Sequence, residues 1–393
     1  MWTEYYRKGW LPDQKIKSET SIDHRSSGSS WATRDSDVMK ALMEINASIK
    51  GIYRSNTDDL TFIIPYATAD RVRFEAMICT VGWILSTTSA KVIIYSAETE
   101  DGFNTAYYQN GPDAPTPYRE KGHITWKQYS DPAFSKEERE DFLVDRLVID
   151  VLSHLYEANL LLKSFNYDIF EQKHFIDLIK SRVSFLVEPR KNGERFHRTR
   201  YLNEMLDKVT TPYVCNHDAD TLLSGHGVMT SLAFLRANSA DIVYPYQRTV
   251  KGQKRVFFHA AQPPGPLNTL LLTGDMTSLL HEGHGILEWP SSYGQSIFAK
   301  VDSYKRAGGE NENFVSWGAE DLERYSRFVK FGFNVARVDA PIVHLEHGRG
   351  SDSSKDHSKF DDNEDLYEKL SSMSVQDLAK YYKNAEYRKK YGW

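Results

Sequence analysis

A strand, a helix and a second strand follow one another after residue 60, and this order constrains the fold more than any other feature of the sequence. Thr61–Tyr66 (TFIIPY) and Lys91–Ser96 (KVIIYS) are short apolar runs that predict strands, and the intervening Asp70–Leu85 has helical spacing. A helix between two strands returns the chain to the same end of a sheet, so the strands are predicted to be parallel. The chain is therefore expected to form an α/β fold.

Later segments continue this alternation of elements. Strands are predicted at Val183–Glu188 and Tyr213–Asn216, with a helix at Thr199–Lys208 between them. Residues 99–135 contain many Gly, Pro and Asp residues and predict a loop, whereas residues 136–181 predict helix. The sheet is therefore expected to carry a mainly helical insertion.

The domain organisation follows from these patterns. A length of 393 residues and a hydrophobic content of 40% are sufficient for a large packed core. We expect an N-terminal extension at 1–57, a main α/β domain at 58–350 with its insertion at 99–181, and a basic helical tail at 351–393.

Composition excludes several classes of protein. The net charge of −5 argues against a protein that coats nucleic acid by charge alone. Cys79 and Cys215 lie in apolar stretches and cannot form a disulfide framework. No apolar run reaches the roughly 18 residues that a membrane span needs, and the first residues contain no signal-peptide core. These observations predict a soluble, cytoplasmic protein.

Two carboxylates directly follow the strand at Tyr213–Asn216. The sequence there reads Asn216-His217-Asp218-Ala219-Asp220. Carboxylates two positions apart on such a turn can share a divalent cation and the phosphates that it bridges. The carboxyl ends of parallel strands are also where ligands bind in α/β sheets. The alternative is an ordinary capped turn, because Asp is common in turns.

Two further motifs follow at Trp317-Gly318-Ala319-Glu320-Asp321 and at His344-Leu345-Glu346-His347. Glu320 and Asp321 precede a helical stretch. Either their negative charges interact favourably with the dipole of that helix, or one of them is a general base. The histidines either complete a metal site beside the carboxylate pair or face solvent.

Four landmarks in this order resemble those of the GT-A nucleotide-sugar glycosyltransferases, closest to the family 2 and β-1,4-galactosyltransferase-like enzymes. They are the IIPY strand, FHRTRYLN at Phe196–Asn203, HDAD, and WGAED followed by HLEH. The resemblance covers about 58–350, with a gap at about 99–181. It implies a GT-A fold, which is a Rossmann-like, doubly wound, mostly parallel mixed sheet.

The resemblance also implies roles for individual residues. Asp321 matches the catalytic base, and Glu320 matches a residue that orients the acceptor. Asp220 and His347 match metal ligands for Mn²⁺ (or Mg²⁺), with His344 and Asp218 as further candidates. The nucleotide sugar would be held by Pro65, Tyr66, Arg71, Glu98, Phe196, Arg198, Asn203, Asp218, Gly294, Trp317 and Gly318.

One departure from the family concerns arginines near the first strand. Galactosyltransferase-like proteins have arginines two and four residues after the strand's proline, but this chain has Ala67 and Ala69 there. The nearest arginine in the sequence is Arg71.

The resemblance implies transfer of a sugar, with inversion, from a nucleotide diphosphate (most commonly uridine diphosphate) to an acceptor hydroxyl. Retaining relatives usually have asparagine where this chain has Asp321, which favours inversion. The acceptor could be a saccharide, a small molecule or a protein side chain. Two alternatives stay open: the same chemistry on a hydroxymethylated DNA base, and a catalytically silent module that binds sugars or nucleotides. The basic, tyrosine-rich end of the chain could contact DNA or be a solvated helix.

Overall fold

The protein's structure is a computed structural model. It describes residues 56–68, 70–107, 124–163, 179–246, 255–259, 286–287, 293–338, 340, 342–347, 355 and 357–393. Nearly all of the predicted N-terminal extension lies outside the described residues, as do 108–123 and 164–178 of the insertion.

Seven strands of the described chain form the large sheet. Their order across the sheet is β3-β2-β1-β4-β9-β6-β10, and β9 alone among these seven runs antiparallel to its neighbours. This confirms the prediction of a mostly parallel mixed sheet. The strands are β1 Leu60–Tyr66, β2 Lys91–Ser96, β3 Val183–Val187, β4 Tyr213–His217, β6 Ile242–Tyr244, β9 Ser296–Lys300 and β10 Val335–Arg337.

A second, smaller sheet has the order β5-β11-β7-β8. It consists of β5 Thr221–Leu223, β7 Arg255–His259, β8 Ile286–Leu287 and β11 Ile342–Glu346. Strand β5 begins only a few residues after β4 ends, so the intervening acidic turn joins the two sheets.

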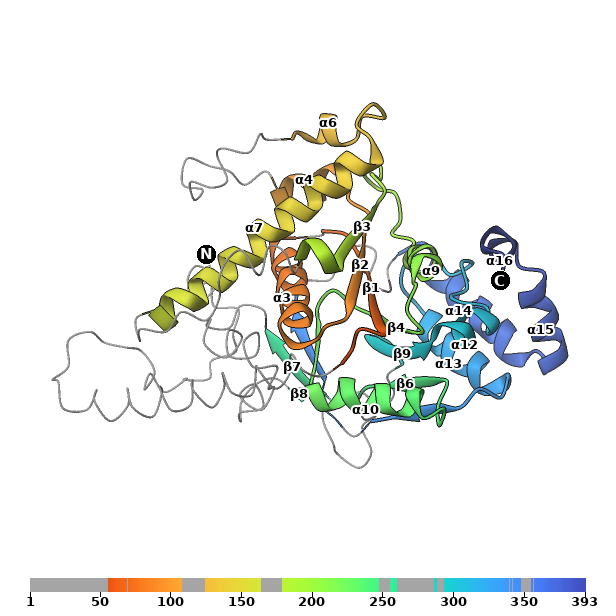
Figure 1. The fold of residues 1–393 in the computed structure, drawn as a ribbon. Coiled ribbons are helices and arrows are strands. Elements are labelled where there is room, and N and C mark those ends of the chain that lie inside the picture. Colours follow the sequence, from red (N-terminus) through yellow and green to blue (C-terminus); the bar gives the residue numbers. More distant parts are fainter. Residues whose placement is uncertain are drawn as a thin grey trace.

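Helices cover both faces of the large sheet, as a doubly wound fold requires (Figure 1). Phe62 of β1 meets Trp83 of α3 on one face, and Tyr95 of β2 stacks on Tyr201 of α9 on the other. The helices are α3 Arg71–Thr87, α4 Glu100–Tyr107, α6 Trp126–Tyr129, α7 Lys136–Lys163, α9 Arg198–Lys208, α10 Gly225–Arg236, α12 Val301–Arg306, α13 Glu320–Lys330, α14 Phe360–Ser372, α15 Val375–Lys383 and α16 Glu386–Tyr391. Among the described helices, none is both long enough and apolar enough to cross a membrane.

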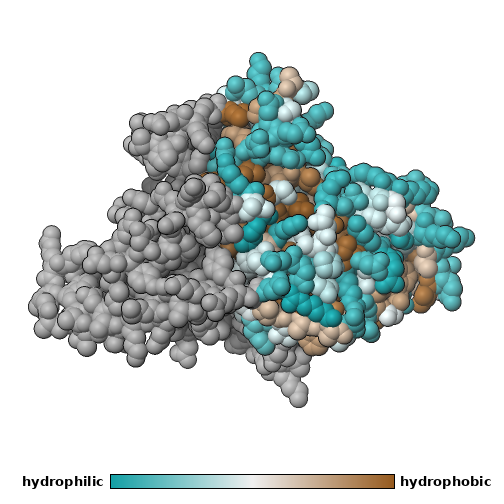
Figure 2. All heavy atoms as spheres, viewed as in Figure 1, coloured by the Kyte–Doolittle hydropathy of each residue, from teal (hydrophilic) through white to brown (hydrophobic). Residues whose placement is uncertain are grey.

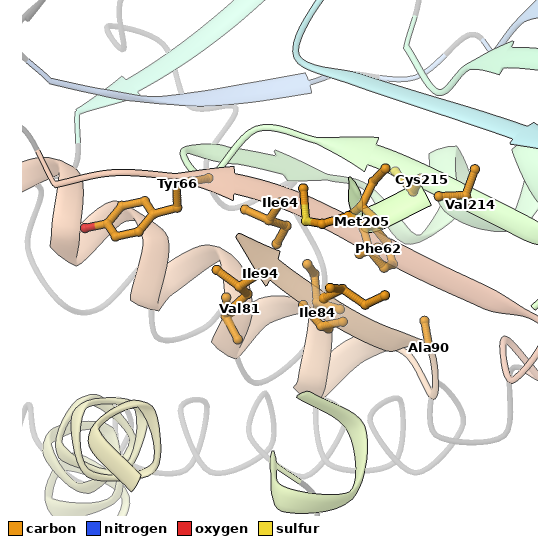
Figure 3. Close-up of a cluster of buried hydrophobic side chains, with 14 of the residues drawn as sticks. Phe62, Ile64, Tyr66, Val81, Ile84, Ala90, Ile94, Met205, Val214 and Cys215 are labelled. Atoms are coloured by element: carbon orange, nitrogen blue, oxygen red, sulfur yellow. The ribbon is translucent and has the colours of Figure 1, made fainter. Parts of the chain in front are cut away.

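The core between α3 and the central strands consists of fully buried aliphatic and aromatic side chains (Figure 3). Helix α3 begins where the Asp70 carboxylate accepts a hydrogen bond from the backbone N–H of Arg73 at 2.8 Å. Val81 and Ile84 of this helix lie against Ile94 of β2, and all three are inaccessible to solvent. Burial of this apolar face holds the helix on the sheet.

The prediction of a continuous loop at 99–135 was wrong for two segments. Helix α4 begins with the acidic first turn that favours a helix N-terminus, and α6 begins with a capping box at Thr125. The rings of Phe103, Trp126 and Tyr129 pack against one another. Contacts between residues more than 20 positions apart thus stabilise helices that local composition does not predict.

The basic end of the chain was predicted to be one helix, but it forms two, α15 and α16. Tyr382 and Tyr387 are buried in a second hydrophobic core with Phe314, Leu370 and Leu378. The described surface shown in Figure 2 is mostly hydrophilic. These two tyrosines therefore stabilise the fold and are not exposed for base stacking.

We expect Trp83→Ala to lower the free energy of unfolding by about 3–5 kcal/mol, because it leaves a cavity between α3 and β1. Trp83 is inaccessible to solvent and stacks on His217 at 6.1 Å. Urea denaturation measures the loss. Val329→Ala is the control, since Val329 is 50% exposed and should lose little. Equal losses in the two variants would contradict the assignment of this core.

Candidate active site

A pocket of about 410 Å³ opens where β1 and β4 of the large sheet end. Four arginines, Arg73, Arg190, Arg195 and Arg198, line it together with the carboxylates of Asp218, Asp220 and Glu320. The predicted residues Pro65, Tyr66, Phe196 and Trp317 also line this pocket. The arginines give the pocket the cationic groups that a phosphate-bearing ligand needs.

The acidic turn between the two sheets is fixed by its backbone. The Asp218 N–H donates to the Gln295 carbonyl at 2.8 Å, just before β9. The Asp220 carbonyl accepts from the Leu345 N–H of β11 at 2.7 Å. Because β11 also pairs with β5, with His344 opposite Thr221, the HLEH segment is brought directly beside Asp220.

His217, which precedes the turn, is a buried structural residue. Its Nε2 lies 2.9 Å from the Thr221 carbonyl and its Nδ1 lies 3.0 Å from Ser296 Oγ. Burial lowers the pKa of His217 to about 4, against the opposing effects of Thr221 and Asp220. The neutral ring therefore donates to Thr221 and closes the turn between β4 and β5.

Asp220, His344 and His347 converge on one point. Their candidate ligand atoms all lie within 4.8 Å of one another. Nε2 of His347 is 2.7 Å from Asp220 Oδ2, and Nε2 of His344 is 3.6 Å from Asp220 Oδ1. Burial alone would raise the pKa of Asp220, but the two histidines and Arg73 outweigh burial and hold it well below its usual range. Asp220 is thus ionised at neutral pH.

This donor set fits a divalent cation. One carboxylate and two imidazoles are ligands that Mn²⁺ and similar ions accept, and a cation would separate nitrogen and oxygen atoms that now face one another. Asp218 is held differently, because its Oδ1 binds Arg198 Nη2 at 2.7 Å.

Arg198 connects the acidic turn to the WGAED motif. Besides Asp218, its guanidinium meets Asp321 Oδ1 through Nη1 at 3.5 Å. Burial raises the pKa of Asp218, Arg198 opposes that rise, and the nearby charges of Asp220 and Asp321 add to it. Arg198 therefore reduces the repulsion between carboxylates that come from distant parts of the chain.

Glu320 and Asp321 occupy the first turn of α13 but differ in environment. Glu320 is 4% exposed, and its Oε2 accepts from the Gly318 N–H at 2.8 Å. Burial and the neighbouring Asp321 raise the pKa of Glu320 to about 7, while Arg198 opposes the rise. The Asp321 side chain is 29% exposed, so it is the more accessible carboxylate of the two.

Two glycines and the segment 315–319 that precedes α13, here called the tryptophan loop, shape the backbone around Asp321. A Cβ atom at Gly294 would clash with Asp321 Oδ2, so only glycine leaves room for this carboxylate. Gly318 has φ +131°, a conformation that favours glycine, and a Cβ atom at this position would press against the Phe360 ring. Trp317 stacks on the Phe360 ring at 5.6 Å. Asn363 Nδ2 donates to the carbonyls of Val315 at 3.0 Å and Trp317 at 3.3 Å.

Glu98 lies behind the pocket wall. Its carboxylate accepts from the Thr68 backbone N–H at 2.9 Å and from the Thr68 hydroxyl at 3.0 Å, and that hydroxyl lies 2.6 Å from the Tyr66 hydroxyl. Burial raises the pKa of Glu98 to about 7, against the effect of the Thr68 hydrogen bonds and of Arg190. Glu98 thus fixes the turn that follows β1.

The structure does not bring every predicted residue to the pocket. Asn203 is buried and holds the backbone of Glu310, with its Nδ2 donating at 2.9 Å and its Oδ1 accepting at 2.8 Å. Arg71 begins α3, but its side chain is outside the described part of the structure. Arg73, two positions later, lines the pocket, and its Nη2 lies 3.4 Å from His347 Nε2. Arg73 was not predicted as a pocket residue, although the sequence Arg71-Val72-Arg73 offers a second arginine two positions after the predicted one.

We expect His347→Ala and Asp220→Asn to weaken Mn²⁺ binding by at least about 10–100-fold, the cost of losing even an outer-shell partner. Isothermal titration calorimetry with MnCl₂ at pH 7 measures the affinity. His226→Ala is the matched control, because His226 is an exposed histidine on α10. Unchanged affinity in the two site variants would show that the cluster holds no metal.

Glu98 should make stability fall as pH rises. Its pKa in the folded protein is about 7, above the ordinary 4.5, so its contribution is complete below pH 4.5 and is lost as pH passes 7. A glutamine at this position cannot titrate. The free energy of unfolding of Glu98→Gln, relative to that of wild type, should therefore rise by about 3 kcal/mol between pH 4.5 and 8. Denaturation at each pH measures this, with Glu386→Gln, 86% exposed, as the control. A constant difference would contradict a raised pKa.

Comparison with known proteins gives one family match. Residues 279–348 match the family model described as the N-terminal domain of galactosyltransferase. No curated protein matches the chain.

Two solved structures are similar in fold. The chain is 8% identical to S. aureus TarS (residues 1–349), with a TM-score of 0.34, covering 73% of this chain and 60% of that one. It is 11% identical to the mannosyltransferase PcManGT from Pyrobaculum calidifontis, solved with GDP-Man and Mn²⁺, with a TM-score of 0.36, covering 79% of this chain and 65% of that one. The chain thus spans less than two thirds of either.

The family match lies over the part of the site that includes Gly294, the WGAED motif and the two histidines of HLEH. The predicted resemblance to glycosyltransferases is therefore confirmed for residues 279–348.

Proposed function

We propose that the protein is a metal-dependent, inverting glycosyltransferase. It would move a sugar from a nucleotide-diphosphate donor, with UDP-sugars as the first candidates, to an acceptor hydroxyl. The family match supports the glycosyltransferase class. The donor, the metal and inversion are our inference from side chains in the pocket and directly beside it.

The arrangement around Arg198 carries this proposal. This arginine touches both Asp218, in the acidic turn, and Asp321, at the start of α13. The proposed diphosphate site and the candidate base would thus lie at the two sides of one guanidinium. A sugar bound beside this guanidinium would have its leaving group on the side of Asp218 and the attacking hydroxyl on the side of Asp321, the arrangement that inversion needs.

Asp220, His344 and His347 would hold the divalent cation, which neutralises the charge that develops on the departing diphosphate. Arg73 and Arg198 would add positive charge to the same pocket. Asp321 would accept the acceptor's proton as the new C–O bond forms and the bond to the diphosphate breaks. Trp317, held by Phe360 and Asn363, would cover the sugar and exclude water.

Asp321→Asn should retain donor binding and lose turnover by about 10²–10⁴-fold, because it removes the proton acceptor while keeping the shape of the side chain. The measurement is hydrolysis and binding of a panel of UDP- and GDP-sugars, with Mn²⁺ and with a chelator. Asp302→Asn, an 81% exposed carboxylate on α12, is the control.

The outcomes of the panel separate the candidate functions. Metal-dependent turnover of one donor by wild type, lost in Asp321→Asn, supports the proposal. Undiminished turnover in Asp321→Asn would overturn the assignment of the base. Metal-dependent binding with no turnover, even when saccharide, small-molecule and hydroxymethylated DNA acceptors are added, would favour a silent binding module.

A further inference from the structure

We propose that Arg324 is the positioning residue for Asp321, and that it acts as the last link of a buried chain, Asn203–Glu310–Arg324. This inference rests on the proposed function in one respect, since Asp321 matters for transfer only if it is the base. The placement of its carboxylate by Arg324 is a separate, structural statement.

Arg324 lies one turn after Asp321 on α13, and its side chain is 1% exposed. Its Nη2 donates to Asp321 Oδ1 at 2.6 Å and to the Tyr293 carbonyl at 2.9 Å, next to Gly294. Oδ1 is therefore held, whereas Oδ2 faces the space that Gly294 leaves. The guanidinium fixes the position of Oδ1, because the bonds of its planar fork to the Tyr293 carbonyl and to Glu310 leave it little freedom to turn.

Arg324 is itself held from behind by Glu310. Its Nη1 donates to Glu310 Oε1 at 2.8 Å, and both side chains are 1% exposed. The same oxygen accepts from the Tyr304 hydroxyl and from Asn216 Nδ2. Asn203 holds the backbone of Glu310 through two hydrogen bonds. Asn203, which does not line the pocket, thus acts on the site through Glu310 and Arg324.

Stability alone does not explain why the Arg324–Glu310 ion pair is buried. Removing two charges from water costs several kcal/mol, and an apolar pair of similar size is often as stable. Arg327 and Glu323, one turn further along α13, form an equally buried pair with N–O at 3.0 Å. That pair binds the carbonyls of Ala307 and Gly309 and the Tyr382 hydroxyl. These contacts join α13 to neighbouring segments of the fold. Arg324 differs in that one of its contacts is the candidate base.

Other charged and titratable groups also face Asp321. They are Glu320 on the same helix, Arg198 from α9, Asp218 from the acidic turn and Tyr244 from β6. Arg198 lies farther from Asp321 Oδ1 than Arg324 does, since its Nη1 is 3.5 Å from this oxygen whereas Arg324 Nη2 is 2.6 Å from it. Arg324 is therefore the group that sets the position of Asp321.

The test compares two double variants made on the same helix. Arg324→Met with Glu310→Gln removes the link to Asp321 without leaving an unpaired buried charge. Arg327→Met with Glu323→Gln makes the same exchange at the same depth, one turn away. Crystal structures should show the Asp321 carboxylate displaced in the first variant and unmoved in the second. Arg324→Lys, with Arg327→Lys as its control, is the milder pair if the first double variant fails to fold.

Kinetics gives the second measurement. With Mn²⁺ and the panel of UDP- and GDP-sugars, the Arg324 variants should lose about 10²-fold in kcat, the cost of misplacing a reacting group, while KM for the donor stays within about twofold. The Arg327 variants should keep kcat. A loss of folding stability alone does not produce this split between kcat and KM.

The two proposals can fail separately. An Asp321 carboxylate that keeps its position in the Arg324 variants overturns the positioning role, whether or not the protein transfers sugar. Displacement of Asp321 with unchanged kcat shows that Asp321 is not the base, which overturns that part of the proposed function and leaves the structural link in place. Equal effects of the Arg324 and Arg327 pairs on kcat also overturn the inference.

Discussion

The pairing of β11 with β5 is the interaction on which the site depends. Strand β5 leaves the acidic turn immediately after β4, and β11 adds to it from a segment more than 100 residues later. This antiparallel pairing carries His344 and His347 to Asp220, and the hydrogen bond from Leu345 to the Asp220 carbonyl fixes the register. A shift of one residue would turn His344 to the other face of the small sheet and separate it from Asp220.

The site concentrates negative charge, and buried arginines make this concentration compatible with folding. Asp218, Asp220, Glu320 and Asp321 would repel one another if left alone. Arg198 is shared between two of these carboxylates, and the others are met by histidine or by backbone N–H groups. A cationic ligand beside Asp220 would relieve part of this charge, so its binding and the folding of the turn are coupled.

Patterns within short segments predicted the sheet and the location of the motifs, while long-range contacts decided the rest. The strand at Thr61–Tyr66 and the helix after WGAED follow from local spacing, and both are confirmed. Helices α4 and α6 carry local start signals that the loop-like composition of 99–135 concealed, and ring contacts with α7 stabilise them. Arg324 and Glu310 are 14 positions apart, and nothing in either local pattern predicts that they meet.

The C-terminal helices have a consequence for where this protein can be divided. Composition placed a boundary near residue 350, yet Phe360 and Asn363 hold the tryptophan loop, and Tyr382 bonds to Glu323 of α13. Contacts of α14 and α15 therefore join this stretch to α13 and to the residues around Trp317. A truncation near residue 350 would thus remove the side chains that hold Trp317, together with the packing of Trp393 on Tyr391 and beside Lys305.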